Sequence, residues 1–413
     1  MVGATMPDSE IYVWATDGFD RFTTIWQFED FWTRANTFEA CLRFVKAAQA
    51  KWPADPEVEA METFLRQEMI PANQTYFTFY LSQAMWADDY GWCGIASLTA
   101  RDYLLSVGDA PGAAAYLAIA QLCWTKMFTS GYDQSDGAQP VPHGCGNGNG
   151  TDPGTKNTVT NANLFVLSLR LYEILGATAY LQMSYQQYLW FSSWFESQYG
   201  YLRTVGVGSG LVQERPIAEP DYEQKDRPTW EPGWVWTGDQ GLVLGALAGI
   251  LQITDALKAV DPSFDPNQVR AWIATIVTGT RSLLFDVSDN VLREPPFNSA
   301  FGDDPKDYVC GRGVLLRYLS EIAVQPYLGD QFSTGIAATA EAVWNGRDTT
   351  TDQFGADWNP ANDSAFNQQF AKAWGDGDTD VSWPYGTNED APVNGILQAA
   401  GLDVLGAAIP ISG

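Results

Sequence analysis

The amino-acid sequence predicts an all-α protein, an (α/α)6 toroid of six helical hairpins. Stretches with helical hydrophobic periodicity follow one another along the 413 residues, loops rich in glycine, proline, asparagine and aspartate separate them, and strand patterns are scarce. Helix pairs separated by long loops on alternating sides are typical of a toroid. In such a fold the inner helices meet at a central mouth, where the loops build the site.

The hydrophobic spacing defines the helices one after another. In 161–176, for example, Leu164, Leu167 and Leu171 repeat at helical spacing, and Gly176 ends the segment. The segments predicted to be helical are 30–51, 57–69, 90–107, 110–129, 161–176, 178–198, 239–257, 266–285, 311–325, 333–345 and 391–408. Allowing for breaks within them, we expect about ten to twelve helices.

One helix near the end of the chain, 311–325, is predicted to be amphipathic. Leu315, Leu319 and Ile322 would share one side, while Arg317 and Glu321 would point elsewhere. The segment 199–213, with Gly208-Ser209-Gly210 at its centre, is the one candidate for a short hairpin of strands.

No shift in composition and no linker marks a domain boundary. We therefore expect a single catalytic domain over residues 1–413, with residues 1–25 as an N-terminal extension packing on it.

The charge and aromatic content narrow the class of partner. Fifty acidic residues against 23 basic ones give a net charge of −27, which disfavours nucleic acid and anionic membrane surfaces as partners. Solubility alone is the plainer reading of the acidity. Aromatic residues make up 14% of the chain, and flat rings suit the C–H faces of sugars. A glycan-facing cleft on a monomeric protein is the expectation.

The cysteine and histidine content argues against a metal site and against a Ser-His-Asp catalytic triad. The five cysteines, Cys41, Cys93, Cys123, Cys145 and Cys310, form no CxxC pair, and His143 is the single histidine. Asp376-Gly377-Asp378-Thr379-Asp380 begins like a calcium loop, but Val381 and Thr387 stand where that motif needs glycine and glutamate. We therefore expect no cofactor and no bound metal.

The start of the chain and its apolar runs bear on location. The first ten residues, MVGATMPDSE, have neither the basic nor the apolar region of a signal peptide, and no run of about 20 apolar residues is present. Either the numbering starts after a removed signal peptide or the protein is cytoplasmic, and of the two we expect an extracellular protein whose signal peptide lies outside this numbering.

The strongest chemical motif is an adjacent pair of acids between aromatic residues, in the run Trp86-Ala87-Asp88-Asp89-Tyr90-Gly91-Trp92. Retaining glycoside hydrolysis needs two carboxyl groups about 5–5.5 Å apart, a separation that neighbours at a helix entrance can offer. Carboxyl groups this close favour keeping one proton between them, which supplies the acid. The alternative is structural: Asp89 caps a helix beginning at Tyr90, and Asp88 is solvated.

Further polar blocks stand at predicted helix starts. Asn157 and Asn161 follow a glycine-rich loop and can bind sugar hydroxyls or cap the helix, two roles of equal weight. Trp236, Asp239 and Gln240 stand at the start of the predicted helix 239–257, and Arg312 stands at the start of the predicted helix 311–325. We take these side chains, with Trp86, Tyr90 and Trp92, as candidate substrate-binding residues.

The order and content of these blocks resemble glycoside hydrolase family 76, the α-1,6-mannanase family, over about residues 26–405. The resemblance rests on five blocks in the right order: Asp88, Asp89 and Trp92; Lys156, Asn157, Asn161 and Arg170-Leu171-Tyr172; Gly238-Asp239-Gln240-Gly241-Leu242; Arg312-Gly313 with Arg317-Tyr318-Leu319; and Trp344, Asn345, Arg347, Asp348, Gly355, Asp357 and Trp358.

The resemblance implies an (α/α)6 barrel and a retaining mechanism without metal, in which Asp88 is the nucleophile and Asp89 the acid/base. It makes hydrolysis of an α-linked polysaccharide the expected activity, first of all as an endo-α-1,6-mannanase. The sequence departs from the family pattern where Cys93 replaces a second Trp, Asp239 an Asn and Arg312 a Lys, and where Gly144–Gly150 replaces a Gly-Gly-Ile-Trp-Trp-like block.

Three alternatives remain open at this point. The protein could be a transglycosylase that shares the covalent step, or a non-catalytic glycan-binding protein on the same fold. The intact acidic pair favours catalysis over binding alone. A lyase or epimerase on an α/α toroid is the third alternative, and the single histidine counts against it because those reactions lean on histidine, tyrosine or arginine bases.

Overall fold

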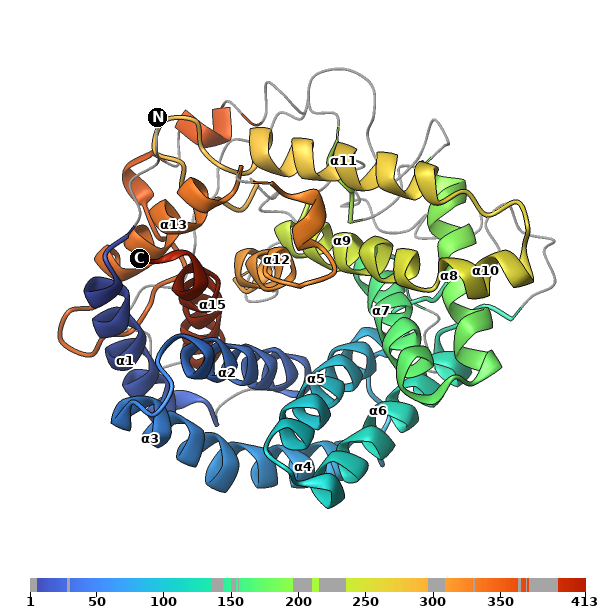
Figure 1. The fold of residues 1–413 in the computed structure, drawn as a ribbon, viewed down its shortest axis with the longest axis horizontal. Coiled ribbons are helices and arrows are strands. Elements are labelled where there is room, and N and C mark those ends of the chain that lie inside the picture. Colours follow the sequence, from blue (N-terminus) through green and yellow to red (C-terminus); the bar gives the residue numbers. More distant parts are fainter. Residues whose placement is uncertain are drawn as a thin grey trace.

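Two concentric layers of helices surround the centre of the molecule (Figure 1). The structure, a computed structural model, describes residues 6–27, 30–134, 144–149, 154, 156–195, 210–214, 235–295, 309–329, 331–362, 365–368, 370 and 393–413. Within these residues there is no β-strand, and β-type backbone pairing is limited to isolated bridges such as that between Tyr132 and Cys145.

Each helical hairpin has an outer part followed along the chain by an inner helix. In the described residues the pairs are α1 (Asp8–Ile25) with α2 (Phe31–Lys51); α3 (Pro56–Phe64), a π-helical turn (Leu65–Met69) and α4 (Ile70–Tyr80) with α5 (Ala87–Ser106); α6 (Ala110–Ser130) with α7 (Thr158–Leu175); α8 (Thr178–Phe195) with α9 (Thr237–Gln252); α10 (Thr254–Val260) and α11 (Pro266–Leu283) with α12 (Gly311–Leu319); and α13 (Ser333–Asn345) with α15 (Val393–Ala408). Every inner helix contacts the next, and α15 contacts α2, which closes the ring. The predicted (α/α)6 toroid is confirmed.

The first helix, α1, belongs to the outer layer. It packs against α15, and its Trp14 stacks on Trp344 of α13 with ring centroids 5.8 Å apart. Residues 8–25 therefore form the outer helix of the first hairpin, where the sequence analysis expected residues 1–25 to be an N-terminal extension packing on the domain.

Local signals explain where several helices begin and end. Asp55 and Asp265 precede Pro56 and Pro266, and each aspartate accepts a backbone N–H of the first turn while the proline fits a position that needs no donor. At the other end of α7, Gly176 adopts a left-handed conformation with φ of 64°, which stops the helix at little steric cost.

The amphipathic interpretation of 311–325 is wrong. Helix α12 ends at Leu319, Ile322 lies in the following turn with 88% of its surface exposed, and Arg317 is buried. All nine residues of α12, from Gly311 to Leu319, are buried. Its sequence therefore carries no single apolar face from which exposure can be predicted.

Arg317 lies in the middle of the ring and ties three inner helices together. Its guanidinium donates to Asp403 of α15 at 3.0 and 2.6 Å and to Glu39 of α2 at 2.9 Å. The side chain of Asn36, also on α2, accepts a further hydrogen bond at 3.1 Å. Buried charge is tolerated here because each group has a partner of opposite sign or a polar contact.

The last inner helix has the composition of a membrane span. Residues Asn394–Ile411 are long and apolar enough by length and hydropathy, but 83% of this window is buried inside the protein. Its contacts with α2 and α12 account for the apolar character, because the helix closes the ring.

Several features predicted from the sequence lie wholly or partly outside the described residues. The proposed strand hairpin lies outside the described residues except for 210–213, and His143 and 376–381 lie outside them entirely. All five cysteines are described, and each is a buried free thiol.

Candidate active site

The inner helices run in the same direction, so their N-terminal ends share one mouth of the ring. The opposite mouth is lined by residues from the second halves of four of them, namely Leu42 of α2, Asp102 of α5, Arg170 of α7 and Gln252 of α9. The starts of these helices therefore gather at the other end. Asp88, about 14 residues before Asp102, lies roughly 20 Å away along α5 at 1.5 Å per residue.

The acidic pair forms the first turn of α5. The helix begins at Ala87, three residues earlier than expected, so Asp89 lies inside the first turn and does not cap a helix at Tyr90. Its carboxylate accepts the backbone N–H of Trp86 at 3.2 Å, and Asp88 accepts the N–H of Asp89 at 3.1 Å. The positive end of the helix dipole favours negative charge at both positions.

Asp88 is on the side of α5 that faces the ring centre. It is four residues before Trp92 and therefore shares a face with it. The Trp92 ring meets the ring of Trp236, at the start of α9, edge to face with centroids 6.3 Å apart. Because α7 lies between α5 and α9 in the ring, this contact reaches across the mouth. Asp88 is partly buried and Asp89 is 7% exposed.

The aromatic residues flanking the pair have different surroundings. Trp86 is 43% exposed at the mouth, free to offer a ring face to a ligand. Tyr90 is buried, its hydroxyl donates to the carbonyl of Gln83 at 2.9 Å, and the same oxygen accepts the N–H of Met85. Tyr90 therefore fixes the loop that leads into α5, a role other than the sugar contact expected from the sequence.

The asparagines at the start of α7 hold backbone. Asn157 caps the helix by accepting the N–H of Thr160 at 3.3 Å. The side chain of Asn161 accepts the N–H of Cys145 at 2.6 Å and donates to its carbonyl at 2.9 Å. Of the two roles left open by the sequence, the structure shows the structural one in each case: Asn157 caps the helix and Asn161 holds the loop.

The loop held by Asn161 touches the acidic pair. The N–H of Ala87, the first residue of α5, donates to the carbonyl of Gly148 at 3.1 Å, and the charge of Asp88 acts on the Cys145 thiol, whose pKa is raised mainly by burial. The glycine-rich segment 144–149 thus lies against the start of the helix that carries the acidic pair.

Gln240 has a similar backbone role at the start of α9. Its amide exchanges two hydrogen bonds of 2.8 Å with the backbone of Val212 and donates to the carbonyl of Trp236 at 3.1 Å. Asp239, its neighbour, is completely buried, and Trp236 is 6% exposed. Among these residues Trp236 is the one whose ring reaches another aromatic residue of the mouth.

Arg312 supplies a cation at the start of α12. Its guanidinium lies 3.6 Å from the centroid of the Trp358 ring and donates to the carbonyl of Ala356. Stacking on tryptophan fixes the orientation of the planar group. The structure therefore brings four helix starts together at one mouth, those of α5, α7, α9 and α12.

Two buried glutamates belong to this mouth and were not found from the sequence. Glu214 accepts the side-chain N–H of Asn157 at 2.8 Å and the N–H of Val159 at 3.3 Å, at the start of α7. Glu294 accepts the backbone N–H of Thr237 at 2.7 Å, at the start of α9. Burial raises the pKa of Glu294 to about 7, against the opposing effects of Thr237 and Arg312.

A shared pattern could have revealed these glutamates. Leu211-Val212-Gln213-Glu214 and Val291-Leu292-Arg293-Glu294 each place an acid after two apolar residues and a polar one, and proline follows within two positions. In both cases the carboxylate lies at the positive end of an inner helix, where it accepts a backbone N–H.

Comparison with solved structures supports the fold. The α-1,6-mannanase from Salegentibacter sp. superimposes with a TM-score of 0.60 at 17% sequence identity, and the match covers 97% of this chain and 100% of that chain. An α-mannanase from Bacteroides thetaiotaomicron gives 0.57 at 12% identity, with 96% and 95% covered. Dfg5 from Chaetomium thermophilum, solved with glucosamine, gives 0.57 at 15% identity, with 93% and 82% covered.

The sequence comparisons identify the family. Among curated proteins, none matches this chain. The sequence profile described as Glycosyl hydrolase family 76 matches residues 12–375, which span the ring from α1 to beyond α13 and include the whole acidic pair. The chain therefore belongs to glycosyl hydrolase family 76.

Proposed function

We propose that this protein is a retaining glycoside hydrolase that cleaves an α-1,6-linked mannan internally. The observation that carries the proposal is the placement of Asp88 and Asp89 in the first turn of an inner helix, with Asp88 on the face that Trp92 turns toward the ring centre. A related α-1,6-mannanase has been crystallised as an inactive variant in which two consecutive aspartates are replaced, with α-1,6-mannotriose bound.

In the first step the Asp88 carboxylate attacks the anomeric carbon, and the bond from that carbon to the glycosidic oxygen breaks. Asp89 gives its proton to the leaving oxygen, so the departing chain is a neutral alcohol. In the second step Asp89, now a carboxylate, takes a proton from water as the water attacks the anomeric carbon and releases Asp88. Two displacements retain the configuration of the anomeric carbon.

The surroundings of the pair suit Asp88 as the nucleophile and Asp89 as the acid/base. The face of Asp88 points to the open centre, where a sugar ring can approach, and the α5 dipole stabilises the charged nucleophile. Trp86, exposed beside the pair, offers a flat surface for the C–H face of a neighbouring sugar. We also propose that the protein acts outside the cell, where a polysaccharide too large to cross a membrane would reach it.

The test is hydrolysis of an α-1,6-mannan within a panel of polysaccharides, with the anomer of the first product read by NMR. Asp88→Asn and Asp89→Asn should each lose hydrolysis by at least about a thousandfold while keeping the parent's melting temperature. Asp20→Asn, on the exposed side of α1, is the matched control. Full activity in both site variants would overturn the proposal, and products longer than the substrate would identify a transglycosylase.

Azide can separate the two roles on an aryl α-1,6-mannobioside. In Asp88→Ala, azide should replace the nucleophile and give a glycosyl azide of inverted, β configuration. In Asp89→Ala the covalent intermediate still forms, so azide should give the α product. The opposite pattern would exchange the roles of the two acids.

A further inference from the structure

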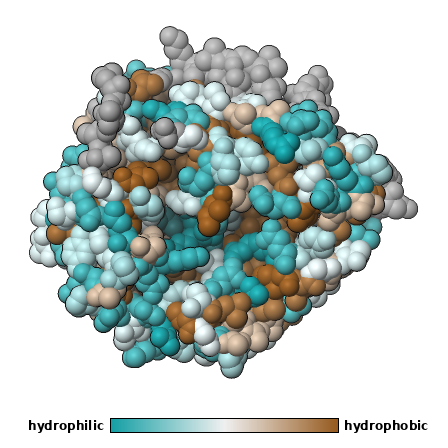
Figure 2. All heavy atoms as spheres, viewed as in Figure 1, coloured by the Kyte–Doolittle hydropathy of each residue, from teal (hydrophilic) through white to brown (hydrophobic). Residues whose placement is uncertain are grey.

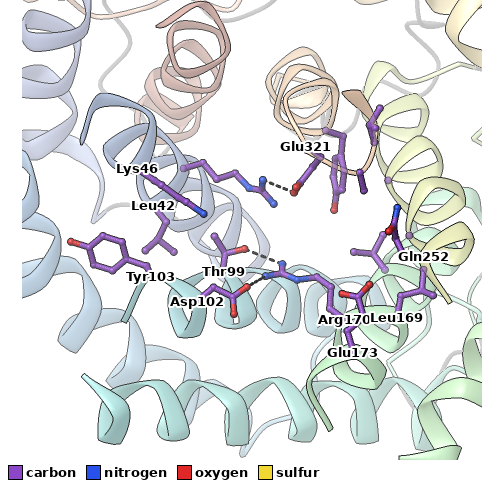
Figure 3. Close-up of a pocket in the computed structure, with 17 residues that line it drawn as sticks. Leu42, Lys46, Thr99, Asp102, Tyr103, Leu169, Arg170, Glu173, Gln252 and Glu321 are labelled. Atoms are coloured by element: carbon purple, nitrogen blue, oxygen red, sulfur yellow. Dashed lines mark hydrogen bonds and ion pairs between the residues drawn. The ribbon is translucent and has the colours of Figure 1, made fainter. Parts of the chain in front are cut away.

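A cavity opens at the mouth of the ring farthest from the acidic pair. It has a volume of about 300 Å³ and is lined by α2, α5, α7, α9 and the end of α12. Figure 2 shows a hollow at the centre of this face, and Figure 3 shows the side chains that point into it. The volume is at the lower end of the range for small-molecule sites.

The charges in this cavity cancel. Arg43, Lys46 and Arg170 oppose Asp102, Glu173 and Glu321, three positive against three negative groups. The lining therefore carries no net charge that would select a strongly charged ligand such as a phosphate or a metal ion.

The paired groups are held in place and keep hydrogen-bonding capacity. Arg43 donates to Glu39 at 2.9 Å and pairs with Glu321 at 2.6 Å. Arg170 pairs with Asp102 at 3.0 Å (Figure 3). A guanidinium has five N–H donors and a carboxylate about four acceptor positions, so these pairs leave donors and acceptors directed by a fixed frame. Alternating donors and acceptors of this kind match adjacent hydroxyl groups.

Two further groups extend the polar surface. Lys46 on α2 and Glu173 on α7 make no ion pair among the described residues and line the cavity from different sides of it (Figure 3). At the rim, Ile322 is 88% exposed between the lining residues Glu321 and Ala323. An exposed isoleucine beside a polar cavity offers an apolar contact for the C–H side of a ring.

We propose that this cavity is a second, non-catalytic site for a neutral sugar of one or two rings. Neutral overall charge, fixed donor and acceptor pairs and an apolar rim are the requirements of a polyhydroxylated ligand. The site lies at the C-terminal ends of the inner helices, and the same ring thus holds glycan at both mouths. The choice of an α-1,6-linked probe rests on the proposed function, whereas the class of ligand does not.

The test uses isothermal titration of the full chain carrying Asp88→Asn and Asp89→Asn, with α-1,6-mannobiose as the probe. We expect two bound sugars per chain and one after Gly249→Met fills the cavity. A side chain fits at Gly249 because an added Cβ would meet the flexible end of Leu169 at 3.1 Å. A single bound sugar that Gly249→Met removes would support this site even if the catalytic mouth binds none.

Hydrogen exchange locates the binding. The sugar should slow exchange in peptides covering 166–175 and 245–252, and Glu173→Ala should weaken this protection about tenfold. Glu59→Ala, an equally exposed glutamate on α3, should leave it unchanged. An unchanged number of bound sugars in Gly249→Met, with the protection of these two peptides retained, would overturn the proposal, and so would protection of these peptides by inorganic phosphate in place of the sugar.

Discussion

Asn161 holds both backbone groups of Cys145, accepting its N–H at 2.6 Å and donating to its carbonyl at 2.9 Å. This two-point contact joins the start of α7 to the loop 144–149. The loop in turn accepts the N–H of Ala87, at the start of the helix that carries Asp88 and Asp89. An amide on one inner helix thereby supports the first turn of its neighbour, which carries the proposed catalytic pair.

Removing the amide should therefore impair activity more than folding. For Asn161→Ala we expect a loss of about 1–3 kcal/mol in the free energy of unfolding, because buried backbone groups of Cys145 lose their partner. The value of kcat/KM should fall at least about tenfold, since small displacements of catalytic groups are costly. Urea denaturation and steady-state kinetics measure the two effects. Unchanged kcat/KM in a folded variant would remove the loop from the account.

The stability of the protein should depend on pH through Glu294. Its pKa is raised by burial from 4.5 to about 7 in the folded protein, so the folded state binds this proton more tightly than the unfolded chain does. The free energy of unfolding should then fall as the pH rises from about 4.5 to about 7 and level off above, by at most about 3 kcal/mol for this group.

Glu294→Gln isolates that contribution. The amide oxygen can still accept the N–H of Thr237, but it does not ionise, so the fall in stability between pH 4.5 and 7 should be smaller than in the parent. Glu59→Gln, on the exposed side of α3, should leave the pH profile as it is. Parallel profiles for the parent and Glu294→Gln would contradict the assigned shift.

The central ion network should be costly to break and cheaper to replace. Arg317→Met leaves Asp403 buried without its partner and should lower the free energy of unfolding by about 3–5 kcal/mol. Arg317→Met combined with Asp403→Leu removes both charges, and we expect it to be more stable than the single variant. Chemical denaturation of the parent and both variants provides the comparison, and equal stability of the single and double variants would count against this explanation.

Trp86 should act on substrate binding without supporting the fold. Since 43% of its surface is exposed, Trp86→Ala should change the free energy of unfolding by no more than about 0.5 kcal/mol. Loss of a stacking surface should raise KM for a mannan oligosaccharide by about tenfold, with a smaller effect on kcat. An unchanged KM would mean that sugar does not reach this ring.

Much of the fold could be predicted because its signals are local. Aspartate before proline marks the starts of α3 and α11, and Gly176 marks the end of α7. The burial of Arg317 could not be predicted in this way. Helical periodicity distinguishes an exposed face of a helix from a buried one. Because all nine residues of α12 are buried, periodicity gives no sign that Arg317 is buried too, and in the sequence it resembles a surface residue.

The candidate site divides into a catalytic pair that stays a prediction and supporting residues whose partners the structure shows. Asp88 and Asp89 stand out in the sequence as adjacent acids between aromatic residues, and the structure places them in the first turn of α5. Tyr90, Asn161 and Gln240 were grouped with them as sugar contacts, yet their polar groups bind loop backbone. The sequence shows that these residues are polar and near the site, but which partner satisfies them depends on loops folded from distant segments.

The most direct measurement of the central claim is to trap the glycosyl-enzyme with a 2-deoxy-2-fluoro mannosyl fluoride and map the labelled peptide by mass spectrometry. The account predicts a single label, carried by the Asp88 side chain, that releases slowly and restores activity as it leaves. A label on any other residue, or turnover of the natural glycan with inversion of the anomeric carbon and no trapped intermediate, would contradict it.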